Sequence, residues 1–195
     1  MCVGPANSPD LSHLTPILAD FDNSDQEARR IIMELSDGQA NWRPSETGWS
    51  IAQCLDHLGR ANTLYAVAMR QAVERTQAAK KLPPRPIQPR WLSRVVIGIV
   101  EPPPNLRFRS PKKAVPLPRI AGRDALALFL RSQEDVRVVI RIGARFDLNR
   151  IRFRIPFLKL LSFTVGTGLL IVAAHNRRHL WQAQRVLECA GFPKS

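Results

Sequence analysis

The chain has 195 residues, of which 45% are hydrophobic and 7% aromatic, so it can bury one ordinary core and is short for two. Its formal net charge of +13 is uneven, because residues 1–80 hold 7 basic and 10 acidic side chains (−3) and residues 81–195 hold 22 and 6 (+16). Such asymmetry is typical of proteins that meet nucleic acid or an anionic membrane surface, but also of a solvated basic surface. The absence of zinc-finger spacing, RNP aromatics and a helix-turn-helix signature makes nucleic-acid binding unlikely.

Cysteine usage and the first residues indicate a compartment. Cys2, Cys54 and Cys189 are odd in number and widely spaced, and the start MCVGPANSPDLSH has neither a basic nor an apolar leader region. We therefore expect a reduced, cytoplasmic setting. The stretch 155–174 carries a single charge, Lys159, but its proline and glycines break it, so we expect a core helix rather than a membrane span.

The first predicted helix follows a lead-in of residues 1–23. Ser24 and Glu27 have the spacing of a capping box, in which a Ser hydroxyl and a Glu carboxylate three residues later satisfy free backbone N–H groups. Behind this pair an amphipathic stripe predicts a helix that ends at Gly38. The apolar positions of the stripe are Ala28, Ile31, Ile32 and Leu35.

The second predicted helix begins after a turn at residues 42–48. Ser50 and Gln53 form another capping-box pattern, and the helix that it opens runs to about Thr76. His57 lies at the edge of the apolar stripe of this helix. Residues 82–122 are rich in Pro and Arg and predict a long connection, in which Trp91 to Val100 is the best candidate for an extra helix or a short hairpin.

Two more helices complete the chain. Asp124 is the expected N-cap of a third helix that ends at Gly143, and an Arg-rich link without convincing strand alternation follows. A fourth helix starts near Thr164 and continues to about Ala190. The expected architecture is thus an all-α four-helix bundle, a single domain over 1–195, with a long connection between helices 2 and 3.

Histidines carry the clearest chemical signal. The chain has four of them, and His175 and His179 are spaced i, i+4, which places both imidazoles on one helix face within reach of one ion at about 2.0–2.2 Å. Such a pair alone is more often packing than a metal site. The scarcity of other histidines, and His57 beside a core stripe on another helix, favour a metal site with His57 as the third ligand.

The site would hold a divalent ion and leave coordination positions open. Three imidazoles suit Zn, Ni, Fe or Mn, and the open positions can take water or substrate, as in catalytic rather than structural sites. Cys54, one turn before His57, could be a fourth ligand or a reactive thiol, but a small core residue is the better interpretation. Asp56 is expected on the surface, and no catalytic residue is assigned.

Four further residues near the predicted ligands keep open interpretations. Gln182 could bond a metal-bound water or be solvated, and Arg178 could neutralise an anionic substrate or pair with an acid. Trp49 and Trp181 are expected to pack the bundle.

Two segments resemble one family. Residues 48–58 read GWSIAQCLDHL, similar to the W-S-x-x-x-x-x-x-H-L segment of DinB-like (YfiT-like) proteins, and residues 175–182 read HNRRHLWQ, similar to their H-x-x-R-H-x-x-Q segment. The resemblance implies an up-down-down-up four-helix bundle, a divalent ion held by His57, His175 and His179, and a homodimer. It also implies a small-molecule substrate, because some members resemble metal-dependent hydrolases and others are thiol S-transferases or isomerases.

Two functions of different classes are therefore expected. The first is a metal-dependent enzyme, either a hydrolase or a transferase that uses low-molecular-weight thiols. The alternative is a non-catalytic, metal-stabilised binding module whose basic C-terminal half holds an acidic partner.

Overall fold

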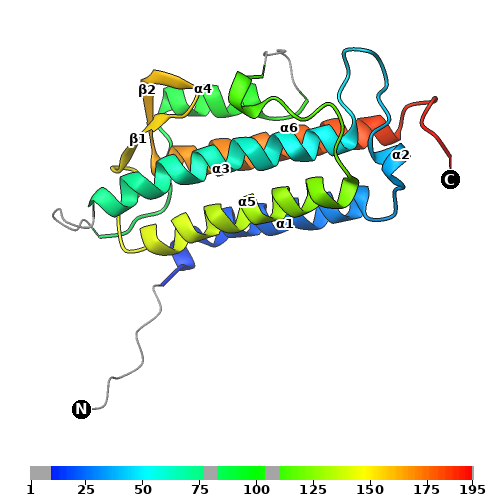
Figure 1. Cartoon of the computed structure of the whole chain (residues 1–195). Helices are drawn as coiled ribbons and strands as arrows, with labels where there is room; N and C mark the ends of the chain where they lie inside the picture. Colours follow the sequence, from blue (N-terminus) through cyan, green and yellow to red (C-terminus); the bar gives the residue numbers. More distant parts are fainter. Residues whose placement is uncertain (1–9, 77–82, 104–109, 195) are drawn as a thin grey trace.

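The computed structural model describes residues 10–76, 83–103 and 110–194. Over these ranges four long helices form a bundle (Figure 1), and they are α1 (Thr15–Ile32), α3 (Ile51–Thr76), α5 (Gly122–Gly143) and α6 (Val165–Leu187). The shorter elements are η1 (Ser12–Leu14), α2 (Asp37–Ala40), α4 (Trp91–Val100), η2 (Lys112–Ala114), β1 (Arg152–Ile155) and β2 (Leu158–Thr164).

The bundle has an up-down-down-up order. α1 and α3 each pack mainly against α5 and α6, so α1 and α3 are diagonal to each other. Followed by colour in Figure 1, α1 and α6 run in one direction, whereas α3 and α5 run in the other. The predicted four-helix bundle is confirmed. The neighbouring helices α3 and α5 are parallel, because the long connection returns the chain to the end of the bundle where α3 began.

The first helix begins earlier than the sequence indicated. Pro16 stands in the first turn of α1, where its fixed φ favours a helix start, so the lead-in from Thr15 is helical. Ser24 lies in mid-helix, and its hydroxyl donates to the Asp20 carbonyl at 2.8 Å instead of capping a helix end. The predicted end was also wrong, because α1 ends at Ile32 and Gly38 lies inside α2.

Three other boundaries lie close to the predictions. The backbone N–H of Gln53 bonds the Ser50 hydroxyl at 3.2 Å and the Gln53 side chain bonds the Ser50 N–H at 3.1 Å, so the second capping box is confirmed. Thr164 caps α6 through the N–H of Thr167. Asp124 lies in the first turn of α5, whose N-cap is Ala121, and α6 ends at Leu187 rather than Ala190.

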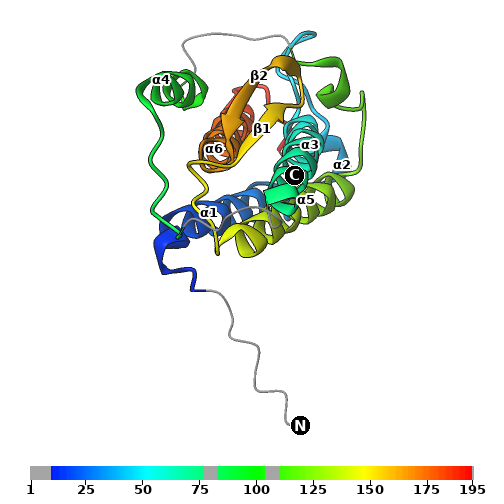
Figure 2. The same ribbon diagram turned by 90° about the vertical axis from the view of Figure 1, so that its left-hand side faces the viewer.

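Two segments outside the bundle shape the rest of the molecule. The candidate helix from Trp91 to Val100 is confirmed as α4, which packs on α6. The expectation of no strands was wrong, because β1 and β2 form an antiparallel hairpin directly before α6 (Figure 2). β1 alternates exposed and buried side chains, with Phe153 and Ile155 buried and Arg152 and Arg154 exposed. This alternation spans only four residues, which is too short to indicate a strand from the sequence.

The core consists of two apolar clusters with a polar layer between them. One cluster, near the hairpin, includes Met69, Leu148 and Leu169, and the other, near α2, includes Leu55, Phe129 and Leu180. Three buried amide side chains from three helices separate these clusters. The Asn62 amide donates to Asn176 and the Asn176 amide to Gln133, both at 2.9 Å, so the buried polar groups bond to one another and fix the register of α3, α5 and α6.

Candidate metal centre

The three predicted histidines meet in one cluster. His57 comes from the first part of α3, and His175 and His179 come from consecutive turns of α6. One ring nitrogen from each lies within 4.8 Å of the other two, and His57 Nε2 is 3.2 Å from His175 Nε2. Two long helices thus direct all three imidazoles to a common point. The cluster lies next to the buried polar layer that contains Asn62 and Asn176.

The His57 ring is fixed by the long connection. Its Nδ1 lies 2.6 Å from the carbonyl oxygen of Ala114 in η2, and the Ser110 hydroxyl lies 3.4 Å from the same nitrogen. Because a carbonyl can only accept, the proton of His57 is on Nδ1 and the Nε2 lone pair faces the other histidines. A carbonyl that orients the far nitrogen of a ring is the usual support of a metal-ligating histidine.

The His179 ring is fixed within its own helix. Its Nδ1 lies 2.9 Å from Oε1 of Gln182, three residues later on α6. This bond again places the proton on Nδ1, so the lone pair of Nε2 is available to a metal ion. Gln182 therefore orients a candidate ligand, a role that the sequence interpretation of a solvated or water-binding Gln did not include.

The surroundings keep all three imidazoles neutral. Burial lowers the pKa of His57 from its ordinary value, against the opposing Ala114 bond and the Asp56 charge. Burial lowers the pKa of His175 well below 6.5, and the repulsion that a protonated His175 would meet from a protonated His179 or His57 and from Arg178 adds to this effect. Burial also lowers the pKa of His179 to about 3. Neutral imidazole is the form that binds metal, so no proton has to leave at neutral pH.

The donor set fits a divalent ion. Bonds of about 2.0–2.1 Å in tetrahedral geometry place ligand nitrogens about 3.3 Å apart, close to the 3.2 Å between His57 and His175. Within the described ranges no carboxylate or thiol joins the cluster. Cys54 is fully buried in the core, where burial raises the pKa of its thiol to about 12, so it serves packing rather than ligation.

Asp56 is buried, against the expectation of a surface charge. Its carboxylate accepts hydrogen bonds from Arg60 at 2.9 Å and from the backbone N–H of Leu117 at 2.7 Å. The Gln53 amide donates to the carbonyls of Leu117 and Pro118. The first turns of α3 thus hold residues 114–118, which we call the strap, in place. The strap in turn presents the Ala114 carbonyl to His57.

Aromatic and cationic side chains border the cluster. The Trp49 ring lies 4.8 Å from the His57 ring and is stacked on the His179 ring at 5.5 Å, and it also packs against the core cluster near α2, as expected. Arg178 donates to the carbonyl of Ile99 at the end of α4, and its charge contributes to the low pKa of His175 and His179. Trp181 is an exposed side chain on α6, against the expectation that it packs the bundle.

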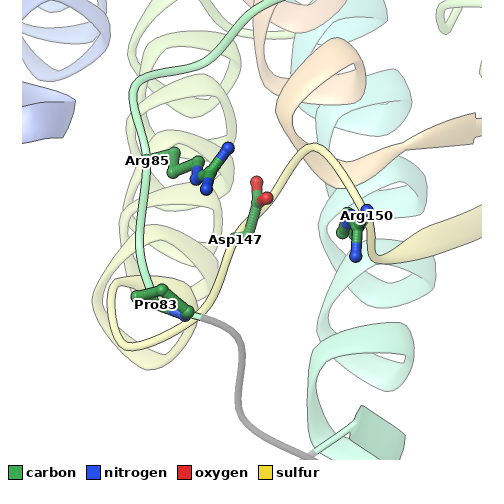
Figure 3. Close-up of a pocket in the computed structure, with 4 residues that line it drawn as sticks. All are labelled: Pro83, Arg85, Asp147 and Arg150. Carbon is green, nitrogen blue, oxygen red and sulfur yellow. The ribbon is translucent and has the colours of Figure 1, made fainter.

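A separate pocket lies at the opposite end of the bundle. Figure 3 shows it between Pro83, Arg85, Asp147 and Arg150, next to the end of α5. Asn149 donates to the Asp147 carboxylate and to the Pro86 carbonyl, which joins the start of the long connection to this loop. None of its lining residues is a histidine or a cysteine, and a single carboxylate does not make a metal site, so the histidine cluster remains the candidate metal centre.

Comparison with known proteins agrees with the fold. Residues 20–183 match the profile of the DinB superfamily. The fold is similar to that of YfiT from Bacillus subtilis, which is described as a probable metal-dependent hydrolase with an unusual four-helix bundle topology. That match has a TM-score of 0.60 and 14% sequence identity, and it covers 98% of this chain and 95% of the other. The search of curated proteins found no match.

Proposed function

This chain belongs to the DinB superfamily, and from that membership and the histidine cluster we propose that it is a metal-dependent enzyme acting on a small molecule. His57, His175 and His179 would hold the ion. The observation that carries the proposal is the set of three neutral imidazoles that each bring one ring nitrogen to a common point, while the Nδ1 atoms of His57 and His179 are bonded elsewhere. A divalent ion bound there supplies Lewis acidity, which lowers the pKa of a water or thiol.

The protein residues around the cluster would bind and orient the substrate. Trp49 forms an apolar wall beside two ligands, which excludes water and offers a surface for a substrate carbon skeleton. Arg178 adds a positive charge close to His175 and His179, which favours substrates with an anionic group. The strap keeps His57 from rotating, so the donor set stays preorganised.

Two reaction classes fit this site. Hydrolysis of an ester or amide is the first, in line with the description of YfiT. Transfer of a low-molecular-weight thiol is the second, and one observation favours it. Among the described residues no carboxylate joins the histidines as a general base, and the nearby Asp56 is bonded by Arg60 and Leu117. A thiol needs less help to lose its proton than water does, since its own pKa is lower.

The test is a pair of assays on untagged protein loaded with Zn, Ni or Mn. One panel contains nitrophenyl esters, and the other contains a thiol with an aryl chloride, in which the new C–S bond replaces C–Cl and chloride and a proton are released. We expect turnover in one panel that disappears in the His175→Ala variant. Equal rates for wild type and variant in both panels would refute the enzyme, and the metal-stabilised binding module would then be the better account.

A further inference from the structure

Large apolar side chains are exposed mainly on two elements outside the bundle. In the described part of the chain, Trp91 on α4 is 73% exposed and Leu160 on β2 is 100% exposed. The same two elements hold five further exposed large apolar side chains, namely Leu92, Val95, Ile99, Leu158 and Leu161, whereas the remaining ones are scattered over other elements. Large apolar patches are rare on the surface of soluble monomeric proteins and usually mark an interaction site.

α4 is apolar on both of its sides. Ser93 is buried and Val96 and Ile97 are partly buried where the helix packs on α6. The exposed residues Trp91, Leu92, Val95 and Ile99 are spaced i, i+1, i+4 and i+8, so they share the opposite arc of the helix. Apart from Arg94 and the buried Ser93, α4 thus carries apolar side chains and a glycine, and the bundle covers the helix on one side only.

α4 and the hairpin stand on the same side of the molecule. In both views they lie on the side of the bundle that is opposite α1 and α5 (Figures 1 and 2). We call this side, with the exposed residues of α4 and β2, the α4–hairpin face. A partner that approaches this side of the molecule would therefore reach both elements.

The charge around this face is positive. Arg90 directly precedes α4, Arg94 lies on it, Arg85 is further back on the segment that leads to it, and Arg152 and Arg154 are on β1; all five are exposed. None of these five forms an ion pair with an acid of the described residues. Glu101, the one acid on the described part of the connection, is already bonded to Arg177. Apolar side chains surrounded by arginines match the interface of an anionic lipid bilayer.

We propose that the α4–hairpin face binds the surface of an anionic membrane, with Trp91, Leu92 and Val95 inserted at the headgroup level. The protein would lie on the bilayer and not cross it, since no described helix is both long and apolar enough for a span. A second copy of the chain fits the face less well, because a two-fold contact would bring the same arginines against each other. The proposal does not depend on the metal or on the reaction.

The test is co-sedimentation of the full-length protein with vesicles. One set contains phosphatidylcholine alone, and the other contains equal parts of phosphatidylcholine and phosphatidylglycerol. We expect binding to the anionic vesicles only, weakened by added salt. Trp91→Ser/Val95→Ser should reduce binding by about tenfold or more, and Arg90→Gln/Arg94→Gln by about fivefold per arginine at low salt. Met33→Ser, which removes an exposed apolar side chain after α1, is the matched control and should bind like the wild type.

Circular dichroism and melting temperature verify that each variant is folded. Equal binding to both vesicle types would overturn the proposal, as would anionic binding that the Trp91→Ser/Val95→Ser change leaves intact, since that is adsorption by charge alone. A dimer in sedimentation velocity that this double change turns into a monomer would assign the face to a second copy. An acidic polypeptide that binds through Trp91 while the anionic vesicles do not would assign it to a protein partner.

Discussion

The buried carboxylate of Asp56 accepts a hydrogen bond of 2.7 Å from the backbone N–H of Leu117, 61 residues further along the chain. The same carboxylate is paired with Arg60 on α3. Asp56 directly precedes the metal-ligand candidate His57, and Leu117 lies three residues after Ala114, whose carbonyl bonds that histidine. One carboxylate therefore connects the helix that carries a ligand with the strap that orients it.

Replacing this carboxylate should weaken both the fold and the site. We expect Asp56→Ala to lower the free energy of unfolding by about 1–3 kcal/mol, because it removes the buried acceptor of the Leu117 N–H and the partner of Arg60, whose side chain is 33% exposed. Urea unfolding measures the loss. Glu74→Ala, which breaks the exposed pair with Arg70 on the same helix, is the control and should have a much smaller effect. Equal losses in the two variants would contradict the structural role given to Asp56.

The bond from His179 to Gln182 gives a prediction about metal affinity. Gln182→Leu keeps the size of the side chain but removes the acceptor of the Nδ1 proton, so the ring loses its fixed tautomer and orientation. We expect metal affinity to fall by about 10–100-fold with the fold intact, as measured by competition with a chromogenic chelator. Gln184→Leu, two residues later on α6, is the matched control. Unchanged affinity in Gln182→Leu would show that the His179 ring needs no such support.

The low pKa of His179 predicts how the metal-free protein responds to acid. A histidine in the unfolded chain titrates near its ordinary value of 6.5, whereas burial lowers the pKa of His179 in the folded state to about 3. Between these values the unfolded state binds a proton that the folded state does not. The free energy of unfolding should therefore fall as pH decreases below about 6.5.

Urea unfolding of chelator-treated protein at several pH values between neutral and 5 measures this dependence. Most carboxylates titrate below this range, so they contribute little to the slope. His179→Gln should show a flatter dependence, because it removes one of the groups that take up a proton on unfolding. A slope as steep as that of the wild type would mean that His179 is not protected from protonation in the folded protein.

Gly168 marks a close contact between α6, β1 and α3. A Cβ at this position would lie 2.6 Å from the Phe153 ring and 2.8 Å from the sulfur of Met69. We expect Gly168→Ala to destabilise the protein by about 1–3 kcal/mol through overpacking, measured by thermal or urea unfolding. Gly98→Ala on α4 is the contrasting case, since nothing lies within 4 Å of its added carbon, and it should be neutral or slightly stabilising. Destabilisation by both changes to the same extent would refute the packing argument.

The sequence predicted which histidines cluster better than it predicted the groups that orient them. His175 and His179 share a helix turn, so local spacing indicates their pairing, and His57 follows from its place beside a core stripe. The bonds to Ala114 and Leu117 join residues about sixty positions apart, and no local pattern encodes contacts of this kind. Asp56 was misplaced for the same reason, because the strap covers the face of α3 that would otherwise be solvated.

The secondary structure shows where local rules hold and where they do not. Ser50 with Gln53 and Ser24 with Glu27 have the same capping-box spacing, yet only the first pair caps a helix. Pro16 starts α1 eight residues before Ser24, so the hydroxyl of Ser24 bonds the preceding turn instead. The hairpin was missed although Arg152 to Ile155 alternate in polarity, since four residues are a weak signal.

The central claim is that His57, His175 and His179 bind one divalent ion. Elemental analysis of untagged protein purified without chelator, after exposure to Zn, Ni and Mn and desalting, tests it most directly. The account predicts about one ion per chain in the wild type and in His13→Ala, which changes the histidine outside the cluster, and none in the His57→Ala/His175→Ala/His179→Ala variant. A wild type without metal, or a triple variant that retains as much metal as the wild type, would contradict it.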